Sequence, residues 1–122
     1  MAAAVDVIKW SPTEPNTLAI AGGYYPQGFT GDVVHSAVYL YSTQTGESDQ
    51  IFLGGERNRI RTIVMTIEWS SDGRHLFFRD HDVNELVRYD IDTKRSMWAG
   101  PREVSTIFYQ YTPSLISFSV LR

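Results

Sequence analysis

The feature that most constrains this chain is a repeated Trp-Ser step. Trp10-Ser11 ends one run of β-forming residues, and Trp69-Ser70 ends another run 59 positions later. Three further short apolar runs follow each step, and residues that favour turns separate them. A unit of this length cannot bury its apolar face alone, so it needs a neighbouring unit of the same kind. The repeat therefore predicts an all-β chain of stacked, four-stranded antiparallel sheets.

The apolar runs define two units and the beginning of a third. Alternation within the runs indicates strands, because Val87 and Tyr89 fall on one face and Arg88 on the other. The step Asp72-Gly73 is typical of a tight hairpin, since Asp can bond to its own backbone and Gly adopts positive φ. We expect the first unit at residues 1–55, the second at 56–103, and a truncated third unit at 104–122.

The first unit is longer than the second between its second and third strands. Trp10 and Tyr41 are 31 residues apart, whereas the corresponding Trp69 and Tyr89 are 20 apart. The 11 extra residues fall at about 24–34. We therefore expect an insertion there.

Two motifs in the second unit resemble those of WD-repeat β-propellers, whose units of about 40–45 residues each form a four-stranded blade. Residues 67–73, IEWSSDG, resemble the family's first-strand ending, and residues 87–90, VRYD, resemble its third-strand Trp-Asp signature. The family's Gly-His pair is replaced by Gly54-Gly55 and Gly100-Pro101, so apolar packing should take the place of its buried polar network. The resemblance implies about two and a half blades of a propeller that acts as a non-catalytic scaffold for protein–protein interaction.

Two narrower resemblances have different functional implications. Residues 38–41, 67–70 and 84–89 together are similar to propellers of echinoderm microtubule-associated-protein-like proteins. That likeness implies a cytoplasmic, cytoskeletal protein that binds tubulin. The W-S-x-D-G step and the run YDIDT also resemble oligopeptidase-type propellers, which accompany a serine hydrolase domain. No such domain is present in this sequence.

The length of the chain conflicts with a closed propeller, which needs about four to eight blades. An incomplete ring exposes strand edges and an apolar face, which recruit other chains or aggregate. We expect a fragment of a longer protein, or a chain completed by a partner such as another propeller chain. Expressed alone, it should be insoluble, oligomeric or partly molten. A cooperative monomer would instead favour a small β-barrel or sandwich, with aromatic residues lining a ligand cavity.

Catalytic, metal and cofactor motifs are missing from the sequence. The histidines His35, His75 and His81 lack metal-ligand spacing, and neither a G-x-S-x-G elbow nor a phosphate-binding loop occurs. Asp80 and Asp82 form a carboxylate pair, but neighbours in a hairpin more often serve as turn formers. Six aromatic residues at strand spacing fit a core between units better than a ligand box: Trp10, Tyr39, Tyr41, Trp69, Phe78 and Tyr89. We predict no enzyme activity, no cofactor and no metal.

Composition narrows the choice of partner and location. The net charge of −3 argues against nucleic-acid binding, and no run of 18 apolar residues is available to span a membrane. There are no cysteines, hence no disulfides, and the amino-terminal residues lack the basic start of a signal peptide. The sequence therefore fits a cytoplasmic protein whose partner is another protein.

One set of loops is a candidate protein-binding face. In a propeller, the loop between the second and third strands opens on the same side as the loop between blades. Arginines at alternate positions of an extended connector would project one way beside aromatic side chains. Arg and Tyr are enriched in interface hot spots, so we expect this face to bind an acidic protein surface such as that of tubulin. The predicted residues are Tyr24, Tyr25, Phe29, Arg57, Arg59, Arg61, His81 and Asp82.

Overall fold

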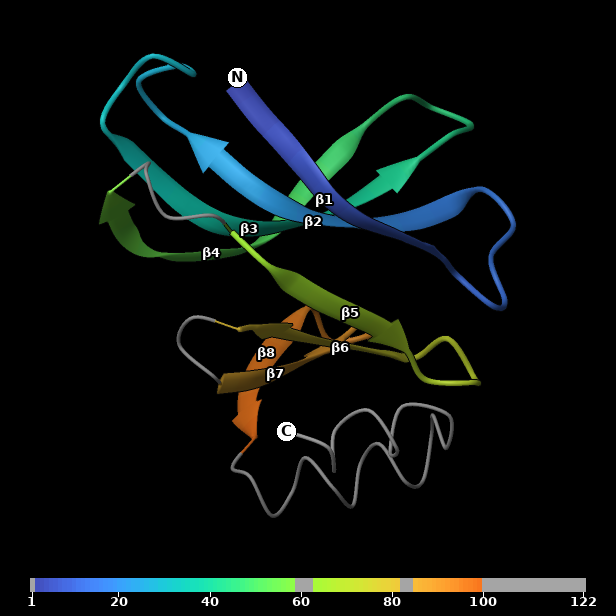
Figure 1. The fold of residues 1–122 in the computed structure, drawn as a ribbon. Coiled ribbons are helices and arrows are strands. Elements are labelled where there is room, and N and C mark those ends of the chain that lie inside the picture. The colour runs from blue at the N-terminus through green and yellow to red at the C-terminus, as the bar shows by residue number, and fades with distance from the viewer. Residues whose placement is uncertain (1, 59–62, 82–84, 100–122) are drawn as a thin grey trace.

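The computed structural model describes residues 2–58, 63–81 and 85–99, which form two four-stranded antiparallel sheets (Figure 1). Within each sheet the strand order follows the chain, which confirms the predicted all-β fold and the four-stranded units. The first sheet contains β1 (Ala2–Trp10), β2 (Thr17–Tyr25), β3 (Val33–Ser42) and β4 (Ser48–Asn58). The second sheet contains β5 (Met65–Trp69), β6 (His75–Asp80), β7 (Glu85–Asp90) and β8 (Arg95–Ala99).

The strands of the first sheet are longer than those of the second. The expected insertion at 24–34 mainly lengthens a hairpin, because β2 and β3 have 9 and 10 residues and their counterparts β6 and β7 have 6 each. β4 continues through Gly54-Gly55 to Asn58, so the expected boundary between residues 55 and 56 falls inside a strand. The expected third unit, 104–122, lies outside the described residues.

The repeat extends to the hydrogen bonds of the turns. Three backbone bonds of the first sheet recur at equivalent positions of the second, all at 2.8–2.9 Å from donor nitrogen to acceptor oxygen. Gly46 (φ 77°) and Lys94 (φ 56°) occupy the same turn position, and Gly73 (φ 73°) has the positive φ expected of it. The three pairs of bonds are Ser11 N to Thr17 O and Ser70 N to His75 O, Thr43 N to Asn16 O and Ile91 N to Arg74 O, and Gly46 N to Ser42 O and Lys94 N to Asp90 O.

Each sheet has a front face, which we define as the face that bears the repeated tryptophan, and a back face opposite it. Residues paired across neighbouring strands lie on the same face. Trp10 pairs with Leu18, and Trp69 pairs with Leu76. The third strand adds Tyr41 to the first front face and Tyr89 to the second. The two front faces are therefore built alike.

The two sheets pack back to front. Small side chains on the back of the first sheet, including Ala19, Ala21 and Val38, share one core cluster with Trp69 and Phe78 from the front of the second. β1 and β2 both contact β5, and Figure 1 shows the second sheet beneath the first. The front of the first sheet therefore faces away from the second sheet.

Among the described residues neither sheet closes on itself, because β1 and β4 are the edges of one sheet and β5 and β8 those of the other. The alternative of a small closed barrel does not fit this arrangement. The predicted aromatic core between units is found at Trp69, Phe78 and Tyr89, but Trp10 is exposed because none of the described strands packs against its face.

Candidate functional site

The aromatic residues of the predicted binding face lie where β2 leaves the first sheet. The rings of Tyr25 and Phe29 are 5.1 Å apart, and Tyr25 also packs against the core cluster. Tyr24 points to the other face, where its ring lies 6.2 Å from that of His35. Phe29 is 53% exposed. The structure thus brings Tyr25 and Phe29 together as a small exposed cluster.

Of the three arginines of the predicted binding face, the structure describes Arg57, which does not join this cluster. Arg57 lies in β4 opposite Val34, so strand register directs it to the back face of the first sheet. Its side chain is 10% exposed and forms an ion pair with Asp80 of β6, which is 4% exposed. The sequence places Arg57 in a connector that projects toward a partner, whereas in the structure it lies within a strand and packs against the second sheet, because β4 continues to Asn58. Arg59, Arg61 and Asp82 lie outside the described residues.

His81 is part of the second sheet's own packing. Its backbone N–H donates to Val64 O at 3.0 Å, and its ring Nε2 lies 2.5 Å from Thr66 Oγ1. The side chain is half-buried. Of the predicted face, the described residues His81 and Arg57 thus make contacts within the fold.

A cavity of about 240 Å³ lies between the sheets beside the ion pair. Its walls are aromatic: the rings of Phe52 and Phe78 are 5.0 Å apart, and those of Phe52 and Trp98 are 6.2 Å apart at 74°. Arg57 and Asp80 form part of its polar lining. The sequence held one signal for this pair, because Asp80 alternates with Leu76 and Phe78 on a buried face, where a charge needs a partner.

Ser36 is a further polar side chain in the lining of this cavity. It is 1% exposed, and its Oγ has no hydrogen-bond partner among the residues described. Gly54 lies against it, since a Cβ at that position would overlap Ser36 Oγ. Gly54 therefore accommodates the close approach of the serine inside β4, whereas the sequence predicts the end of a unit at residue 55.

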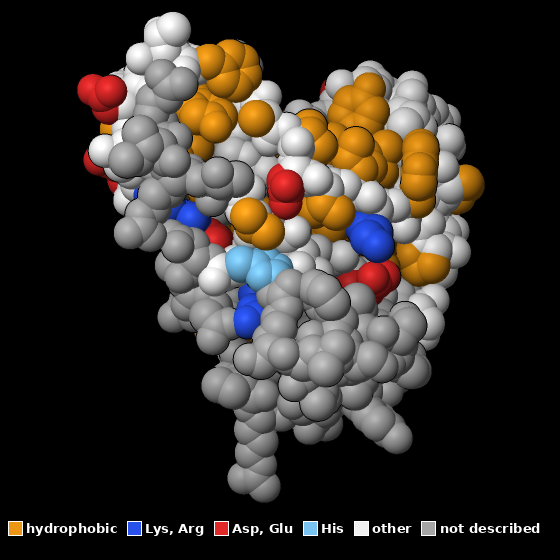
Figure 2. Space-filling model, in the orientation of Figure 1, with side chains coloured by type: hydrophobic (Ala, Val, Ile, Leu, Met, Phe, Trp, Pro, Cys, Tyr) orange, Lys and Arg blue, Asp and Glu red, His pale blue; other side chains and the backbone are white. Residues whose placement is uncertain are grey.

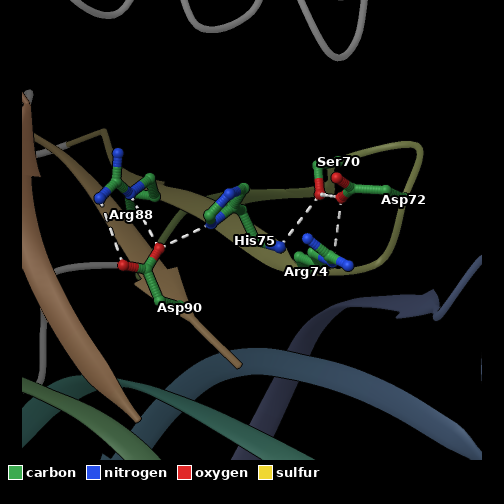
Figure 3. A network of polar contacts seen from close by, with 6 residues as sticks. All are labelled: Ser70, Asp72, Arg74, His75, Arg88 and Asp90. Atoms are coloured by element: carbon green, nitrogen blue, oxygen red, sulfur yellow. Dashed lines mark hydrogen bonds and ion pairs between the residues drawn. The ribbon is translucent and has the colours of Figure 1, made fainter. Parts of the chain in front are cut away.

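A polar network fixes the turn between β5 and β6 (Figure 3). Asp72 Oδ1 accepts hydrogen bonds from Ser70 Oγ at 2.6 Å and from Arg74 N at 3.0 Å, and these bonds lower the pKa of Asp72. Ser70 Oγ in turn accepts the backbone N–H of His75 at 3.0 Å. The predicted Asp-Gly turn is thus confirmed with its own hydrogen bonds.

The network continues to β7 but does not form a nucleophile–base pair. His75 Nδ1 lies 2.6 Å from Asp90 Oδ1, and Arg88 Nε lies 2.9 Å from the same oxygen. Figure 3 shows that Ser70 bonds to the backbone of His75 and not to its ring. A hydroxyl acting as nucleophile needs the imidazole itself as its base. The arrangement therefore ties three strands together.

No group of three or more His, Asp or Glu side chains placed to hold a metal ion occurs in residues 2–58, 63–81 and 85–99. The same ranges contain no helix that could cross a lipid bilayer.

The front of the first sheet is an exposed apolar surface. Hydrophobic side chains gather over the upper part of the molecule, which this sheet forms (Figure 2). Trp10 is 58% exposed, whereas Trp69 at the equivalent position of the second sheet is 5% exposed. We call this surface the open front; its large exposed side chains are Val5, Ile8, Trp10 and Leu53.

Comparisons with known proteins give no relative. A scan of protein-family models, a search of curated proteins and a search of solved structures find no match for this chain. Its function is therefore inferred from its own residues and geometry.

Proposed function

We propose that the chain forms two adjacent blades of a WD-repeat-like β-propeller and serves as a non-catalytic scaffold for protein–protein interaction. The observation that carries this proposal is the back-to-front packing of two like sheets. If two like sheets packed front to front, each would bury its apolar front against the other, and no apolar front would remain exposed. Back-to-front packing leaves one apolar front exposed and favours a further sheet against it, as in a series of blades.

Polar contacts between the first strands fix how the sheets stack. Trp69 Nε1–H donates to Lys9 O at 3.0 Å. Met65 N–H donates to the carboxylate of Asp6 at 2.8 Å. Asp6 is the extra residue of a β-bulge in β1, a feature that re-aims a side chain. These bonds join β1 to β5, which supports stacking of like units through their first strands.

The open front supports the scaffold role, because exposed contiguous apolar surface marks interaction sites. Trp10 is equivalent to Trp69, whose indole donates to a first-strand carbonyl of the sheet in front of it. Trp10 has an exposed indole that can make the same bond to a new sheet. The surface thus fits the back of another four-stranded sheet of this kind, which offers small side chains like those of Ala19 and Ala21.

The polar groups of the second sheet support a structural role over a catalytic one. Ser70, His75 and Asp90 are engaged in hydrogen bonds that hold a turn and neighbouring strands. A cytoplasmic, cytoskeletal setting with tubulin as partner is the narrower form of this proposal. Its support is the resemblance of residues 38–41, 67–70 and 84–89 described above.

Sedimentation of the full chain over a wide concentration range tests this proposal. We expect concentration-dependent association, and we expect Ile8→Glu and Trp10→Glu each to weaken it at least about tenfold, because a charge would be buried without a partner. Phe29→Glu is the matched control, since Phe29 is equally exposed but lies in the 26–32 connection.

Two results would contradict association of the chain through the open front. A wild-type chain that stays monomeric at all concentrations would do so, as would front variants that associate like wild type. An effect confined to Phe29→Glu would place the contact at the Tyr25–Phe29 cluster instead.

A further inference from the structure

We infer that the cavity between β4 and the second sheet binds a small aromatic ring that carries one uncharged hydrogen-bonding group. The inference does not depend on the proposed function, because the cavity lies on the opposite side of the first sheet from the open front. Its volume of about 240 Å³ is below the range of about 300–1,000 Å³ typical of drug-sized ligands. It therefore suits a group the size of one amino-acid side chain.

The ring is implied by the walls of the cavity. Phe52, Phe78 and Trp98 come from three strands of the two sheets and meet around one space. Aromatic rings at about 5–6 Å prefer tilted or edge-to-face arrangements, and a bound ring can extend this set. Trp98 is 60% exposed, so this wall of the cavity also borders solvent.

The hydrogen-bonding group is implied by Ser36. Its hydroxyl is buried in the cavity lining and has no hydrogen-bond partner within the described part of the chain. Buried polar groups are rarely left in this state, because the lost bond to water is not replaced. A ligand hydroxyl or amide placed beside Ser36 Oγ would supply the missing bond.

The absence of charge on the ligand is implied by the ion pair. Arg57 and Asp80 neutralise each other within the cavity lining. The remaining titratable group that lines it is Glu56, which is exposed and would repel an anion. A neutral polar group therefore fits better than a carboxylate or a phosphate.

Two adjacent glycines give a test of the cavity itself. A Cβ at Gly54 would overlap Ser36 Oγ, whereas a Cβ at Gly55 would meet no atom within 4 Å. Both glycines line the cavity and neither has positive φ. Gly54→Ala should therefore obstruct the polar end of the site. Gly55→Ala adds a Cβ to the lining away from Ser36, so it should keep the preference for phenol over toluene. Leu53→Ala, on the opposite face of β4, is the control that should leave binding unchanged.

The experiment is a titration of the isotope-labelled full chain with phenol, followed by the shift of the Trp98 indole N–H signal, which a Trp98→Phe variant assigns. We expect saturable binding with a dissociation constant of about 1 mM, as for a very small ligand. Toluene, which has the same shape without the hydroxyl, should bind about tenfold more weakly. Benzoate should bind more weakly than phenol because of Glu56.

Variants then distinguish binding in this cavity from non-specific binding of aromatic molecules elsewhere on the protein. Ser36→Ala should remove the difference between phenol and toluene, Gly54→Ala should weaken phenol binding about tenfold, and Leu53→Ala should leave phenol binding unchanged. A thermal melt of each variant checks that it is folded. The inference is overturned if Trp98 does not shift up to the solubility limit of phenol. It is equally overturned if folded Ser36→Ala still prefers phenol to toluene, or if the shifts occur at Trp10.

Discussion

The front faces of the two sheets carry equivalent residues in opposite environments. Trp10 and Ile8 on the first sheet are 58% and 50% exposed, whereas Trp69 and Ile67 on the second are 5% and 1% exposed. Their cross-strand partners and the turns beside them are alike. Burial here is therefore set by the presence of a neighbouring sheet and not by the residues of the face. The same side chains stabilise one sheet and make the other a surface for association.

The largest expected difference is between the two tryptophans. Trp69→Ala should lower the free energy of unfolding by about 3–5 kcal/mol, because it opens a cavity in the core and removes the bond to Lys9 O. Trp10→Ala in a dilute, monomeric sample should change it by less than about 1 kcal/mol. Urea unfolding of both variants measures this. Equal losses of unfolding free energy in the two variants would contradict the difference in burial between the two front faces.

The ion pair between the sheets gives the next effect. Arg57→Ala should cost about 3 kcal/mol, because it leaves the buried Asp80 carboxylate without its cation. Arg57→Met combined with Asp80→Leu should cost less than the single change, since no buried charge remains. Chemical unfolding of the two variants tests this. If Arg57→Ala were neutral, Arg57 would be a free surface residue, as the sequence predicted.

The equivalent turns allow a smaller and reciprocal test. Lys94 has φ 56° where its counterpart Gly46 has φ 77°, and positive φ is unfavourable for residues other than glycine. Lys94→Gly should stabilise the chain by about 0.5–1 kcal/mol, and Gly46→Ala should destabilise it by about 1 kcal/mol. Thermal unfolding detects both changes. Lys94→Ala is the control, because it removes the charge but keeps the strain, so it should have little effect.

The smallest expected effect is the pH dependence caused by Tyr89 on the buried front. Burial, and secondly the charge of Asp49, raise the pKa of Tyr89 above its ordinary value of 10.0. The folded state thus holds this proton more tightly than the unfolded state. Its contribution to stability is present below pH 10 and is lost as the pH rises through the raised pKa. Above pH 10, the free energy of unfolding should fall less steeply with pH for Tyr89→Phe than for the wild type. An equal slope for the two proteins would contradict this.

The parts of the fold that depend on local chemistry could be predicted from the sequence. The turn at Asp72-Gly73 follows from two adjacent residues, and alternation around Tyr89 gave the strand. Four-stranded units followed because the same local signals recur at Trp10 and Trp69.

The site could not be predicted in the same way, because it depends on how far one strand continues. Glycines usually weaken a strand, and the sequence predicts the end of the first unit at residue 55. The close approach of Ser36 requires Gly54 inside the strand instead, and the continued register carries Arg57 to the back face. The pairing of Arg57 with Asp80 is a contact between sheets, which alternation within one strand cannot reveal.

The most direct test of back-to-front packing is hydrogen exchange at the indole N–H groups of Trp10 and Trp69 in a dilute sample of the full chain. Trp10→Phe and Trp69→Phe assign the two signals. We expect the Trp69 proton, which is bonded to Lys9 O, to exchange at least about a hundredfold more slowly than the Trp10 proton. Equal rates, or a more protected Trp10, would contradict it.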